Sequence, residues 1–295
     1  MARLICRFAP SPNGFLHLGH AYSSLMNARL ARAHDGLLLL RIEDIDRARS
    51  KPDFERALRE DLSWLGLDWP RPERRQSEFF DAYRAALDDF CARGLAYPCF
   101  CTRGAVAAQV AGRADWPRDP DGAPLYPGAC RDLSSRRRAE RIAAGEKYAL
   151  RLDMARALAE IGAPLTYREY FEGEAPRTMT ARPDLWGDAV IGRRDIPASY
   201  HLACVHDDAA QGITDVMRGA DLEPATGLHV LLQKLLALPT PDYRHHRLVL
   251  DADGDKLAKS KSSVPLRQMR ASGVTARQVI EVLETRMGVR LQGRR

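Results

Sequence analysis

The chain has 295 residues, of which 45% are hydrophobic and 28% charged, as in an ordinary globular protein with a buried core. Its formal net charge of +6 favours a polyanionic partner without identifying one. No apolar run approaches the roughly 18 residues of a membrane span, and the N-terminus shows no secretory signal. We therefore expect a cytoplasmic protein of two or three domains, whose six cysteines are thiols or metal ligands.

The most informative segment runs from Arg7 to His20 and reads RFAPSPNGFLHLGH. It follows a short apolar strand pattern and leads into residues with helical spacing, so it predicts a strand, a turn and a helix. A helix N-terminus offers free N–H groups and a positive dipole end, which suit phosphate. His17 and His20 stand three residues apart there, so both imidazoles can point at one anion. From these residues alone, two exposed histidines explain the pattern equally well.

A second buried strand is predicted at residues 37–42, where an apolar run precedes Glu43. With the first strand and helix it makes a parallel β-α-β unit, and ligands bind such sheets at the carboxyl ends of the strands. Glu43 lies at such an end. Position alone favours a structural role for its carboxylate.

The segment from Arg7 to His20 resembles the first signature of class I glutamyl-tRNA synthetases and their relatives. In that family the histidine pair stabilises charge on the ATP α-phosphate as a carboxylate attacks it. Residues 256–260 (KLAKS) would otherwise be an exposed lysine-rich loop, but they resemble the second signature, K-M-S-K-S, with Ala258 in place of serine. The resemblance implies catalysis by His17, His20, Lys256 and Lys259, and ATP binding by His17, Gly19, His20 and Lys259.

The same resemblance implies a pocket for L-glutamate. In the family motif R-I-E-D-x-D the acidic residue, here Glu43, takes the amino group of the substrate. A tyrosine and an arginine placed like Tyr200 and Arg218 hold the amino acid, and the planar guanidinium suits a carboxylate. His201 and His206 are departures, because most relatives have asparagine and valine there. The implied pocket residues are Arg7, Phe8, Ala9, Pro10, Ser11, Glu43, Tyr200 and Arg218.

Residues 96–189 are rich in Gly, Pro and Arg and look like an insertion in the nucleotide-binding fold. Three cysteines and a tyrosine in this region could complete a tetrahedral zinc site, although spacing alone favours free buried thiols. The short glutamyl-queuosine tRNA(Asp) synthetases carry a similar C-x-C followed by Y-x-x-x-C, which implies one structural Zn²⁺. The ligands would be Cys99, Cys101, Tyr126 and Cys130. The remaining cysteines, Cys6, Cys91 and Cys204, are expected in the core.

We make predictions for two further segments. The cluster formed by Arg131, Arg136, Arg137, Arg138 and Arg141 is by default a solvated helix face, but the catalytic motifs favour contact with RNA phosphates. Residues 245–250 are interpreted as a strand that leads into an Asp-Gly turn.

The resemblance covers essentially the whole chain and implies an α/β fold with a Rossmann-like catalytic domain. We expect its first half at 1–95, a zinc-containing, acceptor-binding-like insertion at 96–189, and its second half at 190–238. Residues 239–295 would hold the lysine signature and a small helical C-terminal domain, with no anticodon-binding domain. The implied reaction forms glutamyl-adenylate from L-glutamate and ATP with Mg²⁺, then transfers glutamate to queuosine in the anticodon of tRNA(Asp). We expect a monomer without a membrane partner.

Three alternatives stay open. A truncated glutamyl-tRNA synthetase would charge the 3′ end of tRNA(Glu), and in that group activation normally requires the tRNA. Another H-x-G-H nucleotidylyltransferase would explain the first signature but neither the lysine signature nor the glutamate pocket. An RNA-binding module without chemistry would leave the paired histidines and lysines unexplained.

Overall fold

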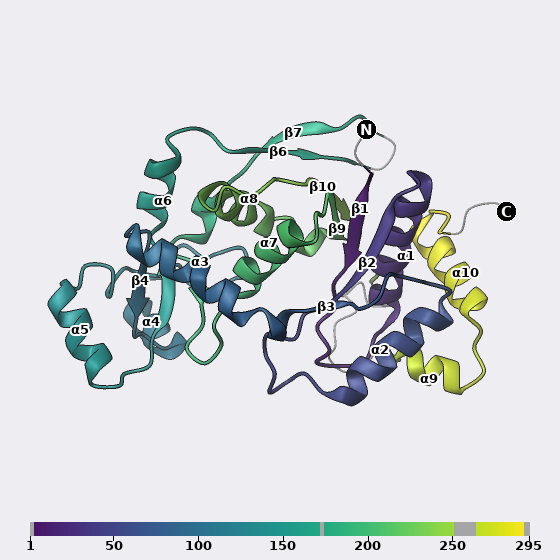
Figure 1. The fold of residues 1–295 in the computed structure, drawn as a ribbon, viewed down its shortest axis with the longest axis horizontal. Coiled ribbons are helices and arrows are strands. Elements are labelled where there is room, and N and C mark those ends of the chain that lie inside the picture. The colour runs from purple at the N-terminus through teal and green to yellow at the C-terminus, as the bar shows by residue number, and fades with distance from the viewer. Residues whose placement is uncertain (1–2, 172–173, 251–263, 292–295) are drawn as a thin grey trace.

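The computed structural model describes residues 3–171, 174–250 and 264–291 (Figure 1). Its N-terminal part is a parallel β-α-β unit, as the apolar runs predict. The elements are β1 (Ile5–Phe8), α1 (Leu18–Ala33) and β2 (Leu37–Ile42). β1 pairs parallel with β2, and the short β3 (Arg74–Arg75) pairs parallel with the other edge of β2. α1 buries Tyr22 and Leu25 against these strands, which sets the direction in which the helix begins.

A second sheet lies next to β1 and continues the first sheet. Its strand order is β7-β6-β10-β9, with β6, β10 and β9 parallel and β7 antiparallel at the edge. Thr214, just before β9, joins the two sheets: its hydroxyl accepts from the Ile5 amide at 2.8 Å, and its amide donates to the Ile5 carbonyl at 2.9 Å. The carboxyl ends of β1 and β9 therefore lie beside each other. The new strands are β6 (Thr166–Glu169), β7 (Arg177–Thr180), β9 (Asp215–Gly219) and β10 (Asp242–His246).

Helices surround these two sheets. α7 and α8 contribute the main buried layer over the second sheet, and α9 and α10 pack beside α1 and α2 at one end of the molecule (Figure 1). The bounds are α2 (Pro52–Trp64), α3 (Phe80–Ala92), α7 (Tyr200–Ala210), α8 (Ala225–Leu235), α9 (Leu266–Ala271) and α10 (Ala276–Met287). Short 3-10 helices span Gln76–Glu78, Pro183–Trp186 and Ala220–Leu222.

An antiparallel sheet with its own helices occupies the opposite end of the molecule (Figure 1). Part of this region has a separate small core around Tyr97, Phe100 and Val106, together with three of the predicted metal ligands. The elements are β4 (Ala96–Cys99), α4 (Arg103–Val110), α5 (Ser135–Ala143), β5 (Ala149–Leu152), α6 (Met154–Ile161) and β8 (Val190–Gly192).

Two expectations are wrong in detail. The strand expected at residues 245–250 instead spans Asp242–His246, because Tyr243 is buried and pairs in register with Val216 of β9. Cys91 is exposed on α3, whereas Cys6 and Cys204 are buried as expected. Within the described ranges, no helix combines the length and apolar character needed to cross a membrane.

Candidate active site

The carboxyl ends of β1, β2, β9 and β10 surround a cavity of about 510 Å³. Parallel strands place their C-terminal residues at one edge, so segments far apart in the sequence meet there. Every described residue that the sequence assigns to glutamate or ATP lines this cavity. They are Arg7, Phe8, Ala9, Pro10, Ser11, His17, Gly19, His20, Glu43, Tyr200 and Arg218. Lys256 and Lys259 lie outside the described residues.

The two histidines lie together at the N-terminus of α1. His17 caps the helix by accepting from the Gly19 amide at 3.1 Å, and the His17 amide donates to Nδ1 of His20 at 3.3 Å. Their ring centroids are 3.9 Å apart. A Cβ at Gly19 would lie only 3.1 Å from the His17 ring, so glycine permits this close arrangement. The positive end of the helix dipole and both imidazoles thus face one position suited to an anion.

Two buried arginines share a single carboxylate beside this turn. Arg7 donates through Nε to Asp208 at 2.8 Å, and Arg41 donates through Nη1 to the same oxygen at 2.7 Å. Burial opposes ionisation of Asp208, but the charges of Arg7 and Arg41 outweigh it and lower its pKa to about 2. Asp208 therefore fixes Arg7 in the cavity wall. Neither Arg41 nor Asp208 was among the predicted site residues, although an arginine within an apolar strand was a visible signal.

Glu43 follows β2 and is 8% exposed. It accepts from Nη2 of Arg41 at 3.2 Å. Burial raises the pKa of Glu43, although the charges of Arg41 and Arg7 act in the opposite direction. A positively charged ligand group, such as the ammonium of an amino acid, would therefore stabilise the ionised form of this carboxylate.

Arg218 lies near the end of β9 and lines the same cavity. It donates to the Thr226 hydroxyl at 2.8 Å and also contacts His229 and His245. Tyr200, at the start of α7, lines the same cavity. An ammonium site at Glu43 and guanidinium groups at Arg7 and Arg218 can together hold an acidic amino acid.

A second cavity of about 920 Å³ lies between this site and the antiparallel sheet, and it shares Ser11, Glu43 and Tyr200 with the first. This cavity was not predicted from the sequence, because its walls come from distant segments. Its lining carries both charges: the basic side chains are Arg49, Arg103, Arg151, Arg193 and Arg194, and the acidic ones are Glu43, Asp46, Asp119, Asp121 and Asp195.

The predicted metal ligands also come together. The sulfur atoms of Cys99, Cys101 and Cys130 lie within 4.8 Å of one another. Cys101 Sγ is 3.7 Å from Cys130 Sγ and 3.5 Å from the Tyr126 hydroxyl. Arg151 donates to Cys99 Sγ at 3.3 Å. Three sulfur donors in one small cluster fit a soft divalent ion such as Zn²⁺.

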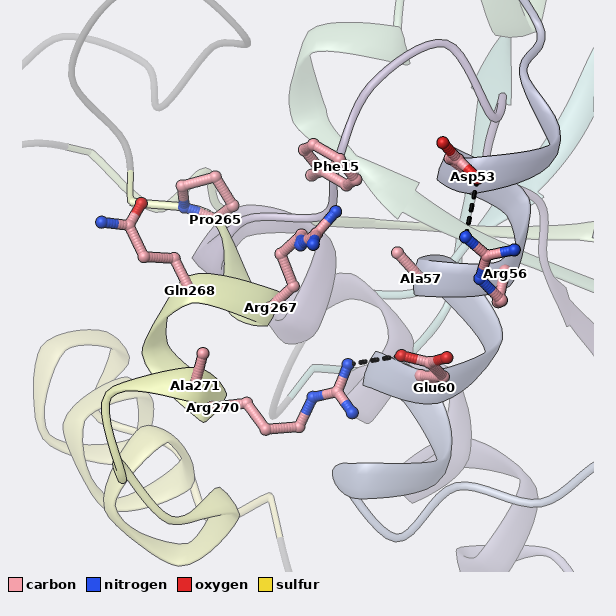
Figure 2. Close-up of a pocket in the computed structure, with 10 residues that line it drawn as sticks. All are labelled: Phe15, Asp53, Arg56, Ala57, Glu60, Pro265, Arg267, Gln268, Arg270 and Ala271. Atoms are coloured by element: carbon pink, nitrogen blue, oxygen red, sulfur yellow. Dashed lines mark hydrogen bonds and ion pairs between the residues drawn. The ribbon is translucent and has the colours of Figure 1, made fainter.

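A third cavity of about 610 Å³ separates α2 from α9 (Figure 2). Two ion pairs line it, Arg56 with Asp53 at 2.7 Å and Arg270 with Glu60 at 2.8 Å, while Arg267 lies over the Phe15 ring. The Leu266 amide at the start of α9 donates to the Leu16 carbonyl at 2.8 Å. This contact links the start of α9 to the segment that leads into His17 and His20, which we call the histidine turn. We therefore interpret the third cavity as part of a structural contact between α2 and α9.

This geometry belongs to the α/β proteins that bind a nucleotide at the carboxyl ends of parallel strands. More narrowly, residues 3–295 match the family described as tRNA synthetases class I (E and Q), catalytic domain, and the chain belongs to that family.

Several known proteins are similar over most of this chain. A glutamyl-Q tRNA(Asp) synthetase of Rhodobacter capsulatus is 46% identical over 276 residues, which cover 92% of this chain and 96% of the relative. A glutamate–tRNA ligase of Aquifex aeolicus is 36% identical over 92% of this chain but 55% of its own length. A solved glutamate tRNA ligase from Elizabethkingia meningosepticum, in complex with its amino acid, has a TM-score of 0.68 at 24% identity. This chain covers 53% of that structure, and the likeness shows the fold.

Proposed function

We propose that this protein is an ATP-dependent ligase that activates L-glutamate and transfers it to queuosine in the anticodon of tRNA(Asp). Membership of the class I family supports an aminoacyl-tRNA synthetase type of reaction. The observation that carries the proposal is the single cavity that holds the histidine pair, Glu43 and two arginines. The choice of RNA rests on the Rhodobacter capsulatus relative, which matches along nearly its whole length.

The reaction assigns a role to each wall of the cavity. Glu43 would bind the ammonium group, and Arg7 and Arg218 would bind carboxylate, with Ser11 and Tyr200 completing the wall. A glutamate carboxylate oxygen attacks the α-phosphorus of ATP, the bond to the bridging oxygen breaks, and pyrophosphate leaves. His17 and His20 would stabilise the negative charge that grows on the phosphate oxygens. Mg²⁺ would enter with the ATP phosphates, and Lys256 and Lys259 keep the role that their signature implies.

In the second step a hydroxyl oxygen of queuosine attacks the carbonyl carbon of glutamyl-adenylate, the bond to the phosphate oxygen breaks, and AMP leaves. We propose that Cys99, Cys101, Tyr126 and Cys130 hold one structural Zn²⁺, which would tie β4 to the loop before α5. The metal would stabilise the insertion and take no part in either step.

The test has two stages. We expect exchange of pyrophosphate into ATP with L-glutamate in the absence of RNA. We then expect transfer of labelled glutamate to tRNA(Asp) that carries queuosine, and no transfer to the same tRNA lacking it. Exchange that requires tRNA(Glu), with charging of its 3′ end, would instead establish the truncated glutamyl-tRNA synthetase. Glutamine in place of glutamate is the control substrate, because the guanidinium groups of the pocket select a carboxylate.

A further inference from the structure

Arg218 is held in an unusual way for a buried arginine. It is 4% exposed, yet across the described ranges no aspartate or glutamate forms an ion pair with it. Its contacts are one hydroxyl and two imidazoles: Nη2 donates to the Thr226 hydroxyl at 2.8 Å, Nη1 to His229 Nδ1 at 3.2 Å, and Nε to His245 Nε2 at 3.3 Å. Arg7 and Arg41, by contrast, both pair with Asp208. Because an unpaired buried charge is costly, Arg218 calls for an explanation.

The contacts determine which nitrogen of each imidazole carries the proton. Arginine has no acceptor, so His229 Nδ1 and His245 Nε2 must both accept from Arg218. The second nitrogen of His229 then donates to His201 Nδ1, 3.2 Å away. The second nitrogen of His245 donates to Glu169 Oε1, 2.6 Å away. Both rings therefore have one nitrogen fixed toward Arg218 and the other fixed by a second residue.

Burial keeps two of these rings neutral, His229 on α8 and His201 on α7. His229 is 1% exposed, and burial, together with the charge of Arg218, lowers its pKa well below the usual value. Burial and the same charge lower the pKa of His201 to about 4. Glu169, 1% exposed, is the nearest carboxylate in this network, but an imidazole separates it from Arg218. The guanidinium is thus oriented on three sides while its charge remains uncompensated by direct contact.

We propose that His229 and His245 are positioning residues that aim Arg218 into the cavity and leave its charge available for a carboxylate of the substrate, with His201 and Glu169 fixing the two imidazoles. This inference rests on the proposed function, because it explains how the pocket selects an acidic amino acid. A carboxylate at either histidine position would pair with Arg218 and compete with the substrate. A neutral acceptor at the same position would preserve the arrangement.

The experiment compares His229→Asp with His229→Asn. Asparagine places an amide oxygen near the position of Nδ1, whereas aspartate adds the missing counterion. We expect His229→Asp to weaken L-glutamate binding, measured by calorimetry, and to raise the KM for glutamate at least about tenfold. The KM for ATP should stay within about twofold, and His229→Asn should raise the KM for glutamate by less than about threefold. His206→Gln, on α7 but outside the contacts of Arg218, is the matched control.

If His229 acted only in folding, His229→Asn would impair glutamate binding more than His229→Asp does, because aspartate would stabilise the fold through a buried ion pair with Arg218 and asparagine would not. Equal glutamate affinity in wild type and a folded His229→Asp variant would overturn the proposal. If His229→Asp fails to fold, the pair His245→Glu and His245→Gln makes the same comparison, and the same equality would overturn it. A wild type that binds glutamate without exchanging pyrophosphate contradicts the proposed function, and the calorimetric comparison still decides the role of the histidines.

Discussion

Asp208 is the residue on which the charge balance of the cavity wall depends. It accepts hydrogen bonds from both Arg7 and Arg41 while being 4% exposed. We expect Asp208→Asn to lower the free energy of unfolding by about 3–5 kcal/mol, because it leaves two buried guanidinium groups with one carboxylate fewer. Urea denaturation at pH 7 measures this. Asp46→Asn, which removes the partner of the exposed Arg49, should change stability by under about 1 kcal/mol. Equal effects of the two variants would contradict this account.

The histidine turn leads to a kinetic prediction at the same scale. Asparagine is a good N-cap, so His17→Asn keeps the start of α1 while removing the imidazole. We expect the kcat of glutamate-dependent pyrophosphate exchange to fall about 10²–10³-fold with little change in the KM for glutamate, because the lost interaction acts on charge that develops in the transition state. His34→Asn, at the other end of α1, is the control. A higher KM for glutamate at unchanged kcat would show that His17 acts in binding instead.

At this scale, local motifs were easier to interpret than networks. The segment from Arg7 to His20 lies in one stretch, and the resemblance placed its residues in a single cavity. The supports of Arg218 come instead from α8 and β10, and sequence spacing does not show that Thr226, His229 and His245 meet there. His201 was noticed only as a departure from the family pattern. In the structure the His201 ring accepts a hydrogen bond from His229, so it belongs to the network that holds Arg218.

Among the elements, the contact between α2 and α9 has an ionisable group at its centre. Asp61 of α2 is 0% exposed, neither of its oxygens has a hydrogen-bond partner, and Arg270 of α9 lies 3.3 Å away. Burial raises the pKa of Asp61 to about 6, with Arg270 opposing the shift. The folded carboxyl thus holds its proton more tightly than the unfolded one. The protein should lose stability as the pH rises from about 4 to about 6.

Asp61→Asn removes this loss. We expect the variant to match the wild type near pH 4 and to exceed its free energy of unfolding by about 1–2 kcal/mol at pH 8, the value being reduced for solvent screening. Urea denaturation at pH 4, 6 and 8 measures the difference. Glu60→Gln is the matched control on the same helix: a hydrogen bond from Arg270 lowers the pKa of Glu60, so this variant should lose stability above pH 5. If Asp61→Asn raised the free energy of unfolding equally at all three pH values, the raised pKa of Asp61 would not be the cause.

Elements with a clear apolar period were predictable, and those with polar functional residues were not. β1, α1 and β2 carry buried apolar residues that alone define them. β10 reads DYRHH, and its polar residues serve the network around Arg218 and Asp215, so the apolar residues that follow it suggested a later strand. Cys91 was assigned to the core from its residue type, but it lies on the outer side of α3, whose buried residues are Tyr83, Leu87 and Phe90.

For the whole molecule, the α/β class could be predicted through the resemblance, whereas the pairing of distant strands could only come from the structure. β6 and β7 fall within the range expected for the insertion, yet they pair with β10 in the second sheet. The limits of the domains, the zinc site and the absence of an anticodon-binding domain stay predictions. On α5, Arg136 and Arg137 both pair with Glu140, and the contact of the arginine cluster with RNA phosphates also stays a prediction.

The separation of the cysteine cluster from the catalytic cavity leads to the last prediction. The cluster belongs to its own small core, which contains Tyr97 and Phe100. We expect about one zinc per chain by elemental analysis and a loss of most of it in Cys101→Ser. Cys91→Ser removes an exposed thiol outside the cluster and should leave the zinc content unchanged. Because a structural metal contributes folding energy to the part that binds it, Cys101→Ser should lower the thermal stability of the insertion.

The consequence for activity separates the two steps of the reaction. In the proposed reaction, glutamate-dependent pyrophosphate exchange takes place in the cavity at the ends of β1, β2, β9 and β10, so Cys101→Ser should retain most of this activity. Transfer to tRNA(Asp) requires the RNA to dock, and the large cavity beside the insertion includes Cys101, Tyr126 and Arg194 in its walls. We therefore expect transfer to fall by at least about tenfold, since loss of the fold there removes phosphate contacts as well as shape. Parallel loss of both activities would show instead that the insertion and the catalytic sheet unfold as one unit.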